Sequence, residues 1–420
     1  MLTTNLRFLK QVHSRNFINL SLNQGVNILI ALIVTPYVFQ TLGEDTFGVV
    51  NLFLSIIMLF SILVNYGFHL NGPKRLALVR HDIVKKEELI NEILWTRLTV
   101  SLLLFISIII CVNVFGLFDQ QAIILLFSTI ILFSEAVFPM FILQGLDRIS
   151  WIAYGNVATK IIYGVSIFLV IQSPSEVRWV NFLFGASALF INVILLCFVY
   201  KAERVRLRLP QLGALVGRFK ENFQYFFSTI AGHISIHGGV VILSNFVTDA
   251  QLGKYALAQR VAFLLRLVPT FVIQSILQQA SIFYQTDKTQ YHSYLKRAYK
   301  YSLVITFIIG VFFSLSAPMV IRIVGGEYVD FSADLLKVMA FIPFASALNV
   351  KNMIEILATE LKSELVKATW LTAFFMVIAS ILGSYYFGAM GLAIALLITE
   401  VVNFIVHRVI LKRTKKQVYK

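Results

Sequence analysis

Long apolar segments separated by short polar loops recur along almost the entire chain. A helix that crosses about 30 Å of hydrocarbon needs ~20 apolar residues, and the segments have this length. The pattern therefore predicts twelve membrane-spanning helices, at residues 17–38, 46–68, 93–115, 121–143, 152–172, 180–200, 222–247, 254–278, 301–322, 333–357, 366–386 and 391–411. Before them, residues 1–16 carry leucines at helical spacing beside Arg and Lys, which predicts a short interfacial helix.

Composition supports an all-α, polytopic membrane protein. Of the 420 residues, 58% are hydrophobic and 14% are charged, whereas a soluble protein carries about 25% charged residues. This difference argues against an ordinary soluble enzyme. Cys111 and Cys197 both lie inside apolar segments, so we expect neither a disulfide framework nor a metal site. The polar loops lack a phosphate-binding Gly-Lys-Ser/Thr motif, and we expect no cofactor.

The placement of the basic residues predicts the topology. Most of the 36 Lys and Arg residues fall in the termini and in every second loop, while the opposite loops hold Arg178, Lys254 and Arg322. Because Lys and Arg accumulate on the cytoplasmic side, both termini are predicted to be cytoplasmic. The loops on the other side are only a few residues long. They leave no room for a catalytic domain, so we expect a protein that is not an enzyme.

An internal repeat is predicted from two similar stretches that each begin a span. Aligning Gly48 with Gly253 gives an offset of 205 residues and places six spans in each half. An even number of spans per half gives a parallel duplication, with two lobes and a substrate site between them. The alternative is that pairs of Gly and an aromatic residue commonly flank membrane spans. The predicted organisation is an interfacial segment (1–16), an N-lobe (17–200), a basic linker (201–221), a C-lobe (222–411) and a basic tail (412–420).

Ionisable residues inside the predicted spans are the first candidates for function, since burying a charge in hydrocarbon costs about 2.5–3.5 kcal/mol. Six are basic and three acidic, and three histidines accompany them: Arg97, Lys160, Arg260, Arg266, Lys337, Lys351, Glu135, Glu355, Glu400, His233, His237 and His407. The basic surplus predicts a cavity that attracts an anion. Guanidinium groups are particularly suited to phosphate oxygens.

Arg260 and Arg266, both in the eighth span, are the leading candidates for substrate contact. The alternative for either is an ion pair between helices that only positions this span. Glu135 and Lys160 lie at equal depth in consecutive spans, which indicates a structural ion pair or, alternatively, proton or sodium coupling at Glu135. Lys337 is a further candidate for substrate contact. The alternative to substrate contact is that the side chain of Lys337 extends to the outer surface of the membrane.

His233 and His237 share one face of the seventh span. We expect them to line a polar cavity and to titrate during transport rather than to bind a metal, because no Cys or acidic partner is near them in the sequence. Arg97 is expected to extend to the cytoplasmic headgroups, and Lys351 and Glu355 to neutralise one another. Glu400 and His407 receive no role. Prolines are expected to interrupt four spans, at Pro36, Pro139, Pro269 and Pro343.

Several short motifs, taken in order with the twelve spans, resemble a known family. They are Asn23 and Pro36, Leu42-Gly43, Phe47-Gly48, Tyr66-Gly67-Phe68, Gln144-Gly145-Leu146-Asp147 and the stretch from Gly253 to Arg260. Together they resemble polysaccharide transporters of the O-antigen flippase (Wzx) type. These belong to the multidrug, oligosaccharidyl-lipid and polysaccharide exporter superfamily.

This resemblance implies a lipopolysaccharide biosynthesis protein of the bacterial inner membrane, which flips undecaprenyl-pyrophosphate-linked oligosaccharide by alternating access through a cationic central cavity. It implies coupling to an ion gradient and contacts with membrane lipids and other polysaccharide assembly proteins, but none with nucleic acid. Arg260 is the first residue implied to bind substrate. The chain has no basic residue between Arg15 and Lys74. In the N-lobe, phosphate binding would therefore fall to Lys160 or Arg97.

Two other functions are open at this point. A drug or cation exporter of the same superfamily would share the architecture but would favour acidic residues in its cavity, against the basic surplus of this chain. A membrane glycan polymerase or acyltransferase would need exposed catalytic loops. No recognisable sequence pattern encodes the sugar composition of the substrate, the coupling ion, the oligomeric state or the source organism.

Overall fold

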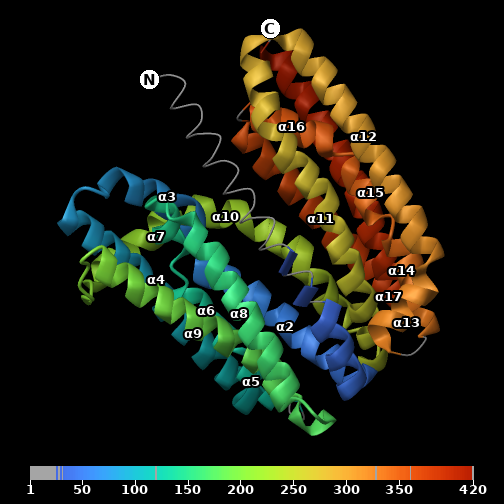
Figure 1. Ribbon diagram of the computed structural model, residues 1–420, viewed down its shortest axis with the longest axis horizontal. Coiled ribbons are helices and arrows are strands. Elements are labelled where there is room, and N and C mark those ends of the chain that lie inside the picture. The colour runs from blue at the N-terminus through green and yellow to red at the C-terminus, as the bar shows by residue number, and fades with distance from the viewer. Residues whose placement is uncertain are drawn as a thin grey trace. The chain divides into compact units, whose positions relative to one another are not determined.

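A computed structural model describes residues 25–26, 29–30, 32–118, 121–326, 329–359 and 361–418. Within these ranges every regular element is a helix (Figure 1). Among the described residues, ten helical segments are long and apolar enough to cross a membrane, and a shorter apolar helix covers Leu32–Leu42. The predicted all-α, polytopic fold class is therefore confirmed. The interfacial segment 1–16 and part of the first span lie outside the described residues.

The chain forms two units, residues 1–42 with 56–230 and residues 43–55 with 231–420. The lobe boundaries proposed from the sequence remain a prediction. Two helices contribute to both units, namely α2 (Glu44–Asn65) and α10 (Leu212–Leu243). The latter begins ten residues before the predicted span, inside the predicted linker.

The first unit is built around a long helix, α4 (Ile83–Phe115), and around α9 (Arg178–Ala202). The former packs against α3 (Phe68–Val79), and the latter packs against α8 (Ile149–Val170). The fourth predicted span is divided into α5 (Ala122–Ser128), α6 (Ile130–Val137) and α7 (Met140–Gly145), all of which pack within this unit. A short 3-10 helix, η1 (Pro174–Glu176), precedes α9.

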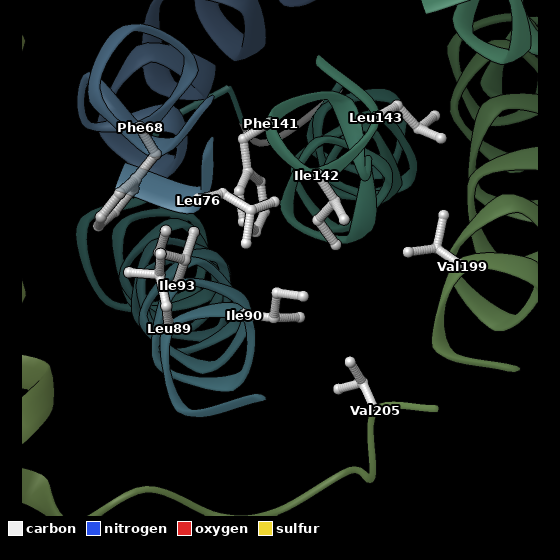
Figure 2. Packing of buried hydrophobic residues seen from close by; sticks show 10 residues of the cluster. All are labelled: Phe68, Leu76, Leu89, Ile90, Ile93, Phe141, Ile142, Leu143, Val199 and Val205. Carbon is white, nitrogen blue, oxygen red and sulfur yellow. The ribbon is translucent and has the colours of Figure 1, made fainter. Parts of the chain in front are cut away.

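A buried apolar cluster joins four helices of the first unit to the chain segment that follows α9 (Figure 2). Its members are Phe68, Leu76, Leu89, Ile90, Ile93, Phe141, Ile142, Leu143, Val199 and Val205. They come from α3, α4, α7, α9 and the segment after α9. Val205 thereby anchors the start of the linker segment on the first unit, since its side chain is removed from solvent with the others.

The second unit is organised by α11 (Asp249–Thr286) and α17 (Lys362–Val418). The former packs against α12 (Lys288–Leu315) and α13 (Ala317–Gly325), and both α11 and α17 pack against α14 (Asp330–Met339), α15 (Ile342–Ala347) and α16 (Val350–Ala358). A second apolar cluster, which includes Tyr291, Leu295 and Ile354, joins α12 to α16.

The last two predicted spans correspond to the two arms of α17, which bends at Gly388. Its φ of 56° is a value that residues with a Cβ rarely adopt. On either side of the bend, a Cβ on Gly383 or on Gly391 would overlap the carbonyl oxygen of the other. The arms therefore approach backbone to backbone at this point.

The prolines expected to interrupt four spans do so in two. Pro139 separates α6 from α7, and Pro343 lies in the first turn of α15 after a break. Pro269 lies inside α11, and Pro36 lies inside the helix of residues 32–42, so neither ends a helix. Neighbouring groups in a membrane protein can satisfy the carbonyl that a proline leaves without a donor. The kinks expected at these two positions stay a prediction.

Candidate functional site

The second unit contains a cavity of about 230 Å³ bounded by α10, α11, α16 and both arms of α17. Three methionines and several aliphatic side chains form its apolar part. Its polar lining consists of Ser235, Gln259, Arg266, Thr369, Thr372, Thr399, Glu400, Asn403 and His407. Ionisable side chains inside an apolar helical unit are costly to bury, so this lining marks the cavity as a candidate functional site.

An ion pair between Arg266 and Glu400 crosses the cavity from α11 to α17. The side chain of Glu400 is 6% exposed and that of Arg266 is 34% exposed. The carboxylate therefore depends on the guanidinium to offset its desolvation. The structure shows the ion pair between helices that the sequence left as the alternative for Arg266.

His407 lies seven residues after Glu400 and lines the same cavity. Its Nδ1 is 2.8 Å from the carbonyl oxygen of Asn403. Its Nε2 is buried and has no hydrogen-bond partner among the described residues. The Asn403 amide oxygen accepts from Thr372 at 3.3 Å. The cavity thus offers an acid, a cation and an imidazole nitrogen within one polar lining.

Glu400 and His407 are the site residues that the sequence analysis left without a role. Their only sequence signal was their position inside an apolar span. The partner of Glu400 is 134 positions away in the chain, and neither helical spacing nor local motifs can identify a contact of that kind. Their assignment required the packing of α11 against α17.

Arg260 lies six residues before Arg266 on α11 and contacts α2 instead of the cavity. Its Nη2 donates to Asn51 Oδ1 at 2.8 Å. The orientation of this amide is set by its own Nδ2, which donates to the carbonyl oxygen of Phe47 at 2.8 Å. Arg260 and Arg266 therefore point to different surroundings, as their spacing of six residues predicts for an α-helix.

His233 and His237 lie on α10 with ring centroids 6.1 Å apart. Both are half-buried, and His237 is within electrostatic range of Arg260. The Nδ1 of His233 is buried and has no partner among the residues that the structure describes. Two imidazoles and one guanidinium thus gather in the second unit beside the 230 Å³ cavity, whose lining includes the neighbouring Gly232 and Ser235.

In the first unit, Glu135 is paired with Arg97 and not with Lys160. The carboxylate is 3.5 Å from Arg97 Nη2 and accepts from Asn65 Nδ2 at 2.9 Å. Lys160 instead places its Nζ 4.6 Å from the ring centroid of Phe184. The predicted pair of Glu135 and Lys160 is therefore wrong. Equal depth in adjacent helices did not determine which faces meet.

Arg97 does not extend to the headgroups as expected. Its side chain is 4% exposed, and it donates to the carbonyl oxygens of Glu135 and Phe138, the latter at 2.9 Å. Pro139 has no N–H to donate to the carbonyl of Glu135, which accepts from the Phe138 amide at 3.3 Å and from Arg97 instead. The helix break therefore explains why a cation is held there. Asn65, Arg97 and Glu135 form a small polar centre inside the first unit.

Lys337 lies at the surface of the second unit. Its Nζ is 2.8 Å from Asp334, and its side chain is 46% exposed. This geometry favours the surface alternative over substrate contact. Lys351 and Glu355, expected to neutralise one another, line a separate cavity with Arg408 and Lys412. The described ion pairs do not include Lys351.

The segment after α9 is held to α4 by backbone and side-chain contacts. Asn91 donates to the carbonyl oxygen of Arg206 at 2.9 Å and accepts from the amide of Arg208 at 3.2 Å. Glu87 accepts from the Arg206 amide at 2.9 Å and pairs with the Arg208 side chain at 2.9 Å. This part of the predicted linker is therefore a strap fixed to the first unit.

No group of three or more His, Cys, Asp or Glu side chains that could hold a metal ion occurs in the described part of the chain. The chemistry offered by the site is that of ion pairing, hydrogen bonding and proton exchange. It suits recognition of a charged molecule or ion more directly than bond cleavage.

Comparisons with known proteins place this architecture among membrane transporters. A family model described as polysaccharide biosynthesis protein matches residues 14–282. A candidate O-antigen transporter of Shigella dysenteriae is 25% identical over 92% of this chain and 97% of its own length. An inward-facing multidrug resistance MATE family transporter matches 95% of this chain and 99% of its own, with 15% identity and a TM-score of 0.71. The lipid II flippase MurJ matches 94% of this chain and 87% of its own, with 14% identity and the same TM-score.

Proposed function

Because the chain belongs to the polysaccharide biosynthesis protein family, we propose that it flips an undecaprenyl-pyrophosphate-linked oligosaccharide across the bacterial inner membrane. The observation that carries this proposal is the similarity to a candidate O-antigen transporter over 97% of that protein's length. The likeness to MurJ supports the fold alone. Both termini of the chain face the cytoplasm in this proposal, as its basic residues predict.

A diphosphate with an attached glycan cannot cross hydrocarbon unaided, because its charges and hydroxyl groups would lose their hydration. Its polyprenyl tail can stay in lipid throughout. The protein therefore has to supply only a polar path that opens first to one side and then to the other. No covalent bond changes, so we assign no catalytic residue.

We assign the diphosphate contact to Arg260, with His233 and His237 as its neighbours. A guanidinium group can bind two phosphate oxygens at once. One of its partners, Asn51, is a neutral amide, and a charged phosphate oxygen is a stronger acceptor for the same N–H group. Phosphate binding therefore exchanges a hydrogen bond of Arg260 to a neutral acceptor for one to an ionised acceptor.

Arg266 has a different role in this proposal, because Glu400 already balances its charge. We assign the pair to holding α11 against the second arm of α17, with substrate contact only when a phosphate displaces the carboxylate. Lys160 serves as a cationic group of the first unit. Lys337 is not retained, since it is paired with Asp334 at the surface.

Glu135 is proposed as the site of ion coupling. Protonation of its carboxylate removes the negative charge that faces Arg97, while the carbonyl oxygen of Phe138 continues to hold the guanidinium. The polar centre of the first unit therefore has two charge states, one with a charged and one with a neutral carboxyl group beside Arg97. A proton suits this geometry better than sodium, because Arg97 already occupies a cation position beside the carboxylate.

A drug or cation exporter is the rival function, and the MATE transporter and MurJ match the fold with equal TM-scores. The experiment uses bacteria that lack their own O-antigen flippase and carry the chain with its glycan pathway. We expect wild-type protein to restore surface glycan, Arg260→Lys to retain part of it, and Arg260→Glu to abolish it at normal protein levels. Resistance to organic cations without glycan display would support the rival function.

A further inference from the structure

A second cavity of about 340 Å³ lies between α12, α16 and the last turns of α17 in the second unit. Figure 1 shows α12 and α16 close together at this end of the second unit, where they also pack against each other. Three basic side chains line the cavity, Lys351, Arg408 and Lys412, together with one acidic side chain, Glu355. The cavity is separate from the one that contains Arg266 and Glu400.

The charge of this cavity distinguishes it from three others. Arg266 and Glu400 balance in the 230 Å³ cavity, as Arg97 and Glu135 do in the first unit. A cavity beside the strap has three arginines and three glutamates in its lining. The 340 Å³ cavity instead carries a net charge of two positive units from its fully charged groups. It is therefore suited to an anion with about two negative charges.

The basic groups are directed to a common space by two helices. Arg408 and Lys412 are four residues apart and share one face of α17, while Lys351 comes from α16. None of the three takes part in the ion pairs formed by the described residues. Their N–H groups thus remain available to an acceptor from outside the protein.

The cavity also has a fixed wall. Asn352 is 8% exposed, and its Nδ2 donates to the carbonyl oxygen of Phe404 at 3.3 Å, which ties α16 to α17. The guanidinium carbon of Arg408 lies 5.8 Å from the ring centroid of Phe404, a distance at which a cation is attracted to an aromatic face. Arg408 is thereby positioned before any ligand arrives.

We propose that this cavity is a loading site for the diphosphate group of a lipid-linked glycan on the predicted cytoplasmic side. The inference rests on the proposed function. A diphosphate that links a polyprenol to a sugar carries two negative charges, which match the net charge of the cavity. Basic pockets between membrane helices on the cytoplasmic side bind phosphate headgroups by the same chemistry.

The test measures binding of farnesyl diphosphate that carries one N-acetylglucosamine, using the full chain in phosphatidylcholine nanodiscs. Measurements in the Arg260→Ala background remove the contact proposed for that residue. Arg408→Gln with Lys412→Gln should raise the Kd about tenfold or more, because two charge-assisted hydrogen bonds are lost. The matched control is Arg413→Gln, since this exposed arginine is next to Lys412 but does not line the cavity. It should leave the Kd unchanged.

Three further results separate this inference from the proposed function. Unchanged affinity in the double variant, with transport by the wild type intact, would overturn the loading site alone. Competition by phosphatidylglycerol, equal to that of unlabelled probe, would identify the cavity as a general phospholipid site and would also overturn it. Transport by the double variant that recovers at saturating substrate would support loading as the step affected. Absence of both binding and transport in the wild type would overturn the proposed function itself.

Discussion

Gly48 of α2 and Gly253 of α11 each lie against the backbone of the helix that carries the other. A Cβ on Gly48 would lie 2.8 Å from the Gly253 amide nitrogen and would overlap the carbonyl oxygen of Asp249. A Cβ on Gly253 would overlap the carbonyl oxygen of Glu44. Each oxygen belongs to the residue four positions before a glycine, so the contact is reciprocal, like an interface with two-fold symmetry. The two glycines aligned in the predicted repeat therefore meet in one close helix crossing, while the repeat itself stays a prediction.

Replacing Gly48 by Ala should destabilise the second unit. The added methyl group meets backbone atoms that cannot move independently of α11, and overpacking of this kind costs about 1–3 kcal/mol. Chemical unfolding in mixed micelles measures the free energy change. Gly217→Ala is the control, because a Cβ at that helical position meets nothing within 4 Å. Equal stability of the two variants would contradict the close crossing.

Removing the charge of Glu400 should destabilise the protein more than removing that of an exposed acid. Glu400→Gln leaves Arg266 without its carboxylate, and breaking a buried pair costs about 3–5 kcal/mol. The partial exposure of Arg266 places the expected value at the lower end. Asp334→Asn, in the exposed pair with Lys337, should cost less than about 1 kcal/mol. The double variant Arg266→Glu with Glu400→Arg should recover part of the loss, and no recovery would argue against a direct pair.

Glu135→Gln should separate substrate binding from its coupling to an ion gradient. The amide keeps the size of the side chain and can still accept from Asn65, but it cannot lose a proton. We expect the variant to bind lipid-linked glycan with wild-type affinity and to transport it at the same rate with and without an imposed pH gradient. The control is Asp147→Asn, an acid that is 84% exposed. Gradient-stimulated transport by the Glu135 variant would make this carboxylate purely structural.

Loss of Asn91 should release the strap after α9. The Asn91 side chain holds the backbone of Arg206 and Arg208, and Asn91→Ala removes both contacts from a residue that is 3% exposed. Trypsin should then cleave after these arginines several times faster, because proteases need locally unfolded chain. Glu88→Gln changes an exposed neighbour on the same helix and should leave cleavage unchanged. Equal cleavage of the two variants would show that Val205 and the contacts of Glu87 anchor the strap without Asn91.

The membrane spans could be predicted from the sequence because hydrocarbon imposes one length and one polarity on every crossing. The partners of buried charges could not. Glu135 pairs with Arg97 and Arg266 with Glu400, and each pairing depends on helix rotation and on breaks such as that at Pro139. Its position inside an apolar span marked Arg266 as a candidate for function. It could not show whether a ligand or a carboxylate balances that charge.

The most direct test of the account is translocation by purified protein in vesicles that contain a fluorescent undecaprenyl-diphosphate-linked glycan. Its exposure on the outer leaflet can be followed with an impermeant quencher. We predict exposure of inner-leaflet glycan that depends on the protein, accelerates with an imposed proton gradient and is lost with Arg260→Glu. Exposure no faster than in vesicles without protein, under conditions in which an organic cation is transported, would contradict the central claim.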